Sequence, residues 1–145
     1  MILYLDASAL VKRYIAEAGS QDVNAWIAAT ESLATSLITH TEVVAAFTRA
    51  QRMKLIAGEE TQRALQVFRS DWESLLRLPM NEATVARGDI LACEYGLRGY
   101  DAVHLATALL WKETLGLPVT LATYDHQLWE IGRLVKLEVL PEHSL

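Results

Sequence analysis

Four acidic residues stand where a strand is expected to end or a helix to begin. Asp6 directly follows the apolar run at 2–5, and Asp125 comes two residues after an apolar segment that ends at Thr123. Glu42 falls in the first turn of a helix expected over 39–53, and Asp101 stands at the start of the apolar helix expected over 100–115. Carboxylates in such positions can cap helices or bind a cation.

Short apolar runs alternate with amphipathic segments along the chain. Strands are predicted at 2–5, 32–36, 77–80, 117–123 and 136–140, and helices at 7–17, 19–30, 39–53, 59–76, 83–95, 100–115 and from Asp125 onward. This alternation is typical of an α/β protein with a mostly parallel sheet. It predicts a single domain over residues 1–145, built as a three-layer α/β/α sandwich.

A parallel sheet would bring the four acids together, because ligands gather where the carboxyl ends of parallel strands meet. Two unit charges about 4 Å apart repel by roughly 4 kcal/mol at an effective dielectric constant of 20. Such a cluster therefore needs protons or a divalent cation. Hard oxygen donors suit Mg²⁺ or Mn²⁺, and the chemistry that this arrangement favours is metal-assisted hydrolysis of a phosphodiester.

Each acid also has a purely structural explanation. Thr39 and Glu42 have the spacing of a capping box, in which the glutamate returns to the backbone N–H of the cap residue. Asp101 and Asp125 are natural N-cap residues, and Asp6 could cap the helix that follows it. Capping and ligation are compatible, because a helix N-terminus stabilises a carboxylate and points into the same crevice.

Two hydroxyl residues lie beside the first and last acids. Ser8 could hydrogen-bond Asp6 or a metal-bound water, and Thr123 could orient Asp125 in a similar supporting way. Ser is also a routine residue near a helix start, and Thr a routine residue at a strand end. Both interpretations remain open at this point.

His104 and several basic residues complete the candidate set. His104, three residues after Asp101, is interpreted as a partly buried histidine bonded to a neighbour rather than as a catalytic base. Arg98 precedes Asp101 in a turn, and Arg49 lies two helical turns after Glu42. Either arginine could contact a phosphate or pair with a nearby acid.

The segments "YLDASALVKRY", "TEVVAAFTR", "RGYDAVHLATAL" and "LATYDHQL" together resemble the PIN-domain ribonuclease family, and most closely its VapC-type toxins of toxin–antitoxin pairs. They occur in the family's order and span nearly the whole chain. The third is the most specific, since an acid, an alanine and then a histidine precede an apolar helix. The second is little more than a glutamate on a helix.

The resemblance implies an endoribonuclease that depends on Mg²⁺ or Mn²⁺. It also implies a homodimer that is inhibited by a small cognate VapB-like antitoxin and reaches operator DNA only through that antitoxin. The residues that match the family's catalytic, metal-binding quartet are Asp6, Glu42, Asp101 and Asp125. Ser8 and Thr123 match its small hydroxyl positions.

Composition sets further bounds. The net charge of −5 argues against an indiscriminate, strongly basic nucleic-acid binder, although it does not exclude a nuclease. The single cysteine, Cys93, excludes an internal disulfide framework and a cysteine-rich zinc site, and it is expected to be a buried structural thiol. A signal peptide and a membrane span are not expected, so the predicted location is the cytoplasm.

Two other functions remain possible from the residues. A phosphatase could use Asp6 as its nucleophile, but the haloacid-dehalogenase type requires a second aspartate at the position that Ser8 occupies. An interaction module could act without catalysis, as a dimer that works on operator DNA through its antitoxin.

Overall fold

The computed structural model describes residues 1–143 and centres on a five-stranded, all-parallel sheet with the order β3-β2-β1-β4-β5. The strands are β1 (Ile2–Leu5), β2 (Ser32–Ser36), β3 (Leu76–Leu78), β4 (Thr120–Ala122) and β5 (Glu138–Leu140). The chain starts in the middle of the sheet, builds one edge through β2 and β3, and then returns to build the other edge. The order of the strands therefore reverses between β1 and β4, which is where open parallel sheets bind ligands.

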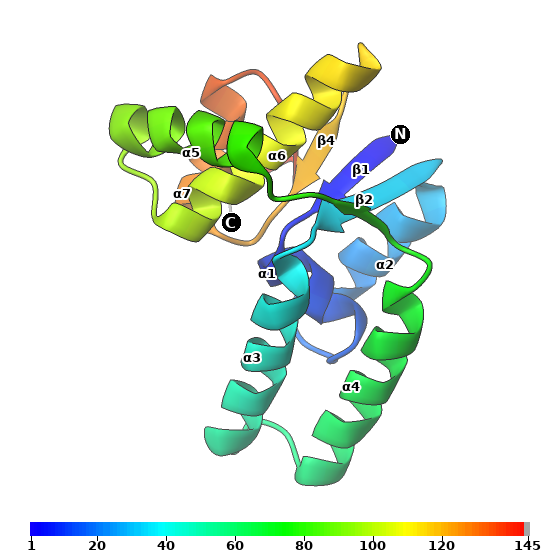
Figure 1. Cartoon of the computed structure of the whole chain (residues 1–145). Helices are drawn as coiled ribbons and strands as arrows, with labels where there is room; N and C mark the ends of the chain where they lie inside the picture. The colour runs from blue at the N-terminus through cyan, green and yellow to red at the C-terminus, as the bar shows by residue number, and fades with distance from the viewer. Residues whose placement is uncertain (144–145) are drawn as a thin grey trace.

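Seven α-helices surround this sheet in the described part of the chain: α1 (Ala7–Leu10), α2 (Ser20–Ala29), α3 (Thr39–Arg52), α4 (Gly58–Trp72), α5 (Glu82–Tyr95), α6 (Gly99–Leu115) and α7 (His126–Leu134). A short 3₁₀ turn, Val11–Arg13, continues α1. In Figure 1, α3 and α4 run side by side and extend away from the sheet as an arm.

The alternation of side chains along β1 produces two cores. Tyr4 faces the layer of α5, α6 and α7, where it packs in a buried cluster with residues such as Leu105. Leu3 and Leu5 face the layer of α1, α3 and α4, where they join a cluster that includes Phe47. Both faces of the parallel sheet are thus covered, which explains why its central strand is apolar throughout. The predicted three-layer α/β/α sandwich is confirmed.

Several elements are shorter than the apolar pattern predicted. The strand predicted at 117–123 is confined to β4, because Pro118 lacks an N–H group for the ladder and leaves only the following residues to pair. The helix predicted at 7–17 consists of α1 and the 3₁₀ turn.

Cys93 is exposed, which contradicts the expectation of a buried thiol. Thr84, Gly88 and Leu91 form the buried stripe of α5, and Cys93 lies off that stripe. No helix in residues 1–143 is both long enough and apolar enough to cross a membrane.

Candidate active site

Asp6 is the most firmly held acid of the site. It directly follows β1, its residue is 3% exposed, and it caps α1 by accepting a hydrogen bond from the backbone N–H of Ala9 at 2.9 Å. Ser8 Oγ lies 2.7 and 2.8 Å from the two carboxylate oxygens, and Thr123 Oγ1 donates to Oδ2 at 2.6 Å. The prediction that Asp6 could cap the following helix is confirmed, and its carboxylate in addition accepts hydrogen bonds from two side-chain hydroxyls.

Burial raises the pKa of Asp6. The positive charge of His104 and the hydrogen bonds from Thr123, Ser8 and Ala9 lower it, but they do not offset the loss of hydration. A carboxylate in this state gains most from a nearby cation, because a positive charge would favour its ionised form.

Ser8 and Thr123 join the two central strand ends. The backbone N–H of Tyr124 donates to Ser8 Oγ at 2.7 Å, and the N–H of Asp125 donates to Thr123 Oγ1 at 3.0 Å. Thr123 therefore supports Asp6 with its hydroxyl hydrogen and the Asp125 backbone with its oxygen. The contact considered between Ser8 and Asp6 is observed. Thr123, which was considered as a support for Asp125, instead donates to the Asp6 carboxylate and contacts only the backbone of Asp125.

Asp125 and Asp101 are linked by Arg98. Asp125 caps α7 by accepting from the N–H of Leu128 at 2.8 Å, as predicted. The guanidinium of Arg98 lies 2.9 Å from Asp101 Oδ2 through Nε and 2.5 Å from Asp125 Oδ2 through Nη2. Arg98 itself is 72% exposed, so this bridge lies at the solvent edge of the site.

The prediction that Asp101 caps its helix is wrong. Arg98 is the N-cap residue of α6, because the helix begins at Gly99, and no side chain closes this end. Asp101 lies in the first turn, where the helix dipole still favours a carboxylate. Partial burial raises the pKa of Asp101, and the hydrogen bond from Arg98 opposes that effect.

The predicted capping box of Thr39 and Glu42 does not form. Ile38 is the N-cap residue of α3, so Thr39 is already helical and cannot act as the cap. Its hydroxyl instead accepts from Thr35 Oγ1 at 2.7 Å, while Glu42 Oε1 lies 2.7 Å from His104 Nε2. Glu42 therefore turns toward His104 of α6 rather than back to its own helix.

His104 is more deeply buried than the sequence suggested, with a side chain that is 2% exposed. Its Nδ1 lies 2.8 Å from the hydroxyl of Tyr4, and its Nε2 contacts Glu42. Burial lowers the pKa of His104, but the hydrogen bond that it donates to Glu42 and the charges of Asp6, Glu42 and Asp101 outweigh this effect, so the pKa is raised overall.

Tyr4 was not among the residues selected from the sequence. A tyrosine in a strand buried on both faces requires a partner for its hydroxyl, and that requirement was the available signal.

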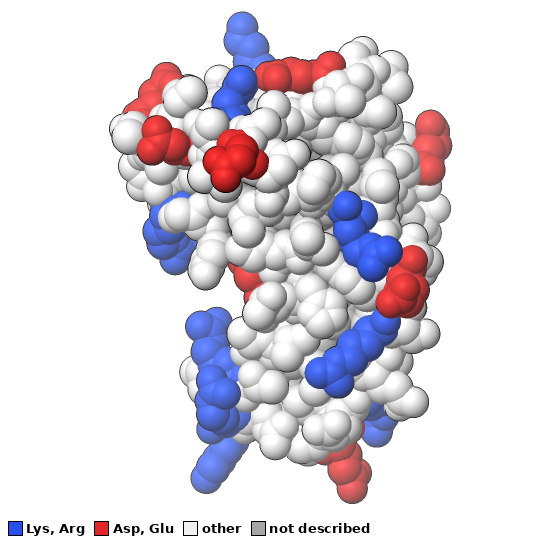
Figure 2. Space-filling view, viewed as in Figure 1, with Lys and Arg blue, Asp and Glu red and all other residues white. Residues whose placement is uncertain are grey.

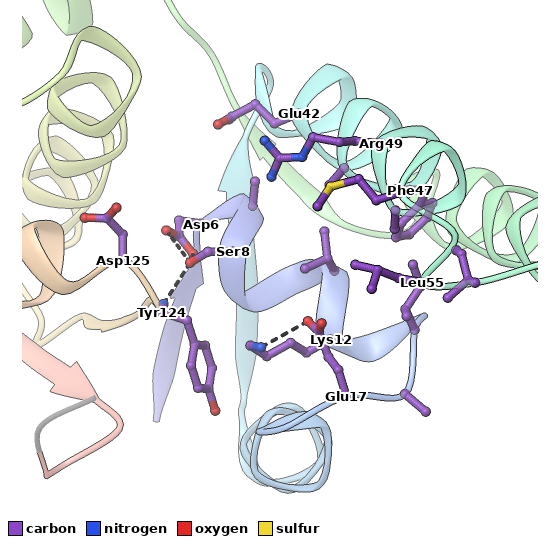
Figure 3. Close-up of a pocket in the computed structure, with 18 of the residues that line it drawn as sticks. Asp6, Ser8, Lys12, Glu17, Glu42, Phe47, Arg49, Leu55, Tyr124 and Asp125 are labelled. Carbon is purple, nitrogen blue, oxygen red and sulfur yellow. Dashed lines mark hydrogen bonds and ion pairs between the residues drawn. The ribbon is translucent and has the colours of Figure 1, made fainter.

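All four acids line one pocket of about 900 Å³. Figure 3 shows Glu42 and Arg49 projecting from α3 on one side, Asp125 facing them from the other, and Asp6 between them. In Figure 2, acidic atoms are visible inside a recess, and Lys and Arg side chains gather along one of its lips. The pocket continues away from the acids into an apolar part lined by Phe47, Leu55 and their neighbours.

The donor chemistry of this pocket fits a hard cation. Within residues 1–143, no three His, Cys, Asp or Glu side chains are grouped closely enough to hold a metal ion as they stand. Mg²⁺, however, usually keeps several waters and is bound through one or two carboxylates, so it does not require a closed cage. The guanidinium of Arg98 already stands between two of the acids as an internal cation.

Comparisons with known proteins agree with this geometry. The model of the PIN domain family matches residues 3–134 of the chain. Ribonuclease VapC45 of Mycobacterium tuberculosis (strain CDC 1551 / Oshkosh) is 32% identical over 108 residues, which cover 74% of this chain and 75% of that protein. Ribonuclease VapC47 of the same strain is 29% identical over 131 residues, covering 88% and 87%.

Solved structures share the fold at lower identity. FitAcB from Neisseria gonorrhoeae has a TM-score of 0.71 at 19% identity and covers 99% of this chain and 100% of its own. VapBC2 from Rickettsia felis, bound to a DNA fragment from its promoter, has a TM-score of 0.65 at 19% identity and covers 96% and 97%. The family match over most of the chain and the identity to Ribonuclease VapC45 show that this chain belongs to the PIN-domain family and, within it, to the VapC ribonucleases.

Proposed function

We propose that this protein is an endoribonuclease that requires Mg²⁺ or Mn²⁺ and acts as the toxin of a toxin–antitoxin pair. The observation that carries the proposal is the gathering of Asp6, Glu42, Asp101 and Asp125 around one pocket, next to the carboxyl ends of β1 and β4. The relatives that are named ribonucleases support RNA as the substrate.

Asp6 would be the central metal ligand, because its position is fixed by Ser8, Thr123 and the α1 N-terminus. Glu42, Asp101 and Asp125 would complete the oxygen donor set, directly or through water. Such an ion supplies water activation near neutral pH and charge stabilisation at the phosphate. The protein's own contribution is to hold its carboxylates in place before the RNA arrives.

Arg49 and Arg98 would contact the RNA phosphates beside the acids. Both line the pocket, and a guanidinium can bind phosphate oxygens through two parallel hydrogen bonds. Arg98 is shared between Asp101 and Asp125, so RNA binding would have to compete with that bridge.

The proposed inhibitor is a small VapB-like antitoxin. The apolar end of the pocket, lined by Val11, Ile15, Phe47 and Leu55, suits the apolar side of an amphipathic peptide segment. Operator DNA would be reached through the antitoxin, since the net charge of −5 disfavours direct DNA binding by this chain.

We also propose a homodimer that uses the α5–α6 face. Met80, Val85 and Tyr100 are exposed apolar side chains around a groove of about 630 Å³ on that face. Light scattering of the purified protein should give the mass of two chains, and Val85→Lys should shift it toward one.

The direct test is cleavage of a synthetic RNA pool by the purified protein with Mn²⁺. Asp6→Asn should lower the cleavage rate by more than about a hundred-fold. Loss of a residue that only supports a metal ligand costs up to about a hundred-fold, and loss of the ligand itself should cost more. The control is Glu113→Gln, because Glu113 is an exposed acid on α6 that pairs with Arg87 away from the pocket. Cleavage that persists in Asp6→Asn and in excess chelator would overturn the proposal.

The same preparation tests the two alternatives. A phosphatase that uses Asp6 as nucleophile would leave a phosphorylated Asp6, which mass spectrometry detects. A purely interacting module would bind its antitoxin yet leave RNA intact in the presence of Mn²⁺. Both carboxylate oxygens of Asp6 already accept hydrogen bonds, which suits a ligand held in place better than a nucleophile.

A further inference from the structure

His104 connects three elements of the fold through its imidazole ring. Tyr4 lies on β1, His104 on α6 and Glu42 on α3. The Tyr4 hydroxyl is 2.8 Å from Nδ1, and Glu42 Oε1 is 2.7 Å from Nε2, so both ring nitrogens have a partner. The ring is buried, and its edge lies against the Tyr4 ring at a centroid distance of 6.0 Å.

The direction of the hydrogen bond to Glu42 follows from the donors available. An ionised carboxylate can only accept, so Nε2 must carry the hydrogen in this contact. In the neutral ring, Nδ1 is then the acceptor, and the Tyr4 hydroxyl donates to it. In the charged ring, the Tyr4 oxygen accepts from Nδ1. His104 therefore donates to Glu42 in either state.

Glu42 is held by one side-chain contact, as Asp101 is, but its partner is a buried histidine rather than an exposed arginine. Asp6 accepts from three residues, Asp125 caps α7, and Asp101 pairs with Arg98. In the described residues, the only hydrogen bond to the Glu42 side chain comes from His104. A glutamate has more rotatable bonds than an aspartate, so holding its carboxylate in one place costs more rotamer entropy.

We propose that His104 is a positioning residue that holds the Glu42 carboxylate in the pocket for a divalent cation, and that the Tyr4 hydroxyl fixes the imidazole for that task. The inference rests on the proposed function, because it requires that Glu42 help to bind the ion. Any buried imidazole needs partners for its nitrogens, but here the partner of Nε2 is a carboxylate that lines the pocket, so the contact that satisfies the ring also fixes the position of that acid.

Two substitutions at position 104 separate the two contacts. In His104→Asn, the amide occupies the place of Nδ1 and can still meet Tyr4, but nothing reaches Glu42. In His104→Gln, the longer amide occupies the place of Nε2 and can still donate to Glu42. The affinity of the RNA-free protein for Mn²⁺, measured by titration calorimetry, should fall at least about ten-fold in His104→Asn and less than about three-fold in His104→Gln.

A double-mutant cycle tests whether His104 acts through Glu42. In a Glu42→Gln background, adding His104→Asn should change the Mn²⁺ affinity by less than about two-fold, since the group that His104 positions is already altered. In steady-state cleavage, His104→Asn should lower kcat and leave KM for RNA nearly unchanged. Independent, multiplying effects of the two substitutions would overturn the inference.

Tyr4→Phe provides a second route if His104→Asn does not fold, which urea unfolding will reveal. It removes one hydroxyl and should weaken Mn²⁺ binding in the wild-type background but not in Glu42→Gln. Equal Mn²⁺ affinity in wild type, His104→Asn and Tyr4→Phe, while Asp6→Asn still abolishes binding, would overturn this inference alone. Absence of Mn²⁺ binding in the wild-type protein would overturn both this inference and the proposed metal dependence.

Discussion

Thr123 donates a 2.6 Å hydrogen bond to Asp6, although 117 positions separate the two residues. The bond joins the end of β4 to the end of β1 at the point where the strand order reverses. The central acid of the site is therefore held by a residue from the far part of the chain, and this bond is open to test.

Thr123→Val keeps the shape of the side chain and removes this bond. A hydrogen bond to a charged group contributes about 1.5–3 kcal/mol, so urea unfolding at neutral pH should show a loss of that order. The Thr123 hydroxyl also lowers the pKa of Asp6, so the acidic limb of the pH–rate profile should move to higher pH in the variant. The matched control is Thr114→Val, because Thr114 is exposed and bonds only to its own helix. Identical acidic limbs in the wild type and Thr123→Val would contradict the role assigned to the hydroxyl.

Arg98→Gln removes the internal cation between Asp101 and Asp125. We expect Mn²⁺ to bind the RNA-free variant at least about two-fold more tightly, because a metal ion no longer competes with the guanidinium for the same oxygens. At the same time, KM for RNA should rise, since a phosphate contact is lost. Arg87→Gln is the control, because Arg87 forms a comparable ion pair with Glu113 away from the pocket. Weaker Mn²⁺ binding in Arg98→Gln would show that the arginine supports the site rather than competing for it.

The stability of the metal-free protein should fall as the pH rises. The pKa values of Asp6, Asp101 and His104 are all raised in the folded state, so the folded protein binds protons more tightly than the unfolded chain. For the aspartates, this stabilisation begins to be lost above their ordinary pKa of 3.8. For His104 it is complete below 6.5 and is lost as the pH passes the raised value.

Urea unfolding in the presence of a chelator, repeated between pH 5 and pH 8.5, measures how steeply the free energy of unfolding falls with pH. Asp6→Asn should make the unfolding free energy depend less on pH, because asparagine has no titrating proton at the more deeply buried of the two aspartate positions. Addition of Mn²⁺ should also flatten this dependence, since the cation replaces the protons that leave. A slope that is the same in the wild type and in Asp6→Asn would contradict the assignment.

Arg49→Gln should weaken RNA binding and leave Mn²⁺ binding intact. Arg49 lines the pocket on α3, two turns beyond Glu42, where it faces the acids without pairing to them in the described residues. In a plot of log RNA affinity against log salt concentration, the slope should become shallower by roughly 0.7, which is the change expected when one phosphate contact to a single strand is lost. Arg69→Gln, an exposed position on α4 outside the pocket, should leave the slope unchanged.

Much of the fold was predictable because buried parallel strands are short, apolar and bounded by polar residues. The runs at 2–5 and 32–36 match β1 and β2 in full, and the alternation with helices indicated the layers. Once the sheet was taken as parallel, the carboxyl ends of its strands placed Asp6, Glu42, Asp101 and Asp125 near one another. The shared pocket confirms that they come together.

The contacts that hold these acids could not be predicted from local spacing. Thr39 and Glu42 have the spacing of a capping box, but the helix begins one residue early, and Glu42 turns to a histidine 62 positions away. The bridge of Arg98 to Asp125 also depends on how α6 and α7 pack together. Such pairings are decided by tertiary packing, which a short motif does not contain.

The middle position of β1 in the sheet has a consequence for synthesis. β1 is synthesised before both strands that pair with it: β2 follows after about 30 residues, whereas β4 begins only at Thr120. Until then Asp6 lacks the hydroxyl of Thr123, and Asp125 has not been made. A nascent or prematurely released chain that stops short of β4 therefore carries Asp6 but not the assembled acidic pocket, which can form only after β4 and Asp125 have been synthesised.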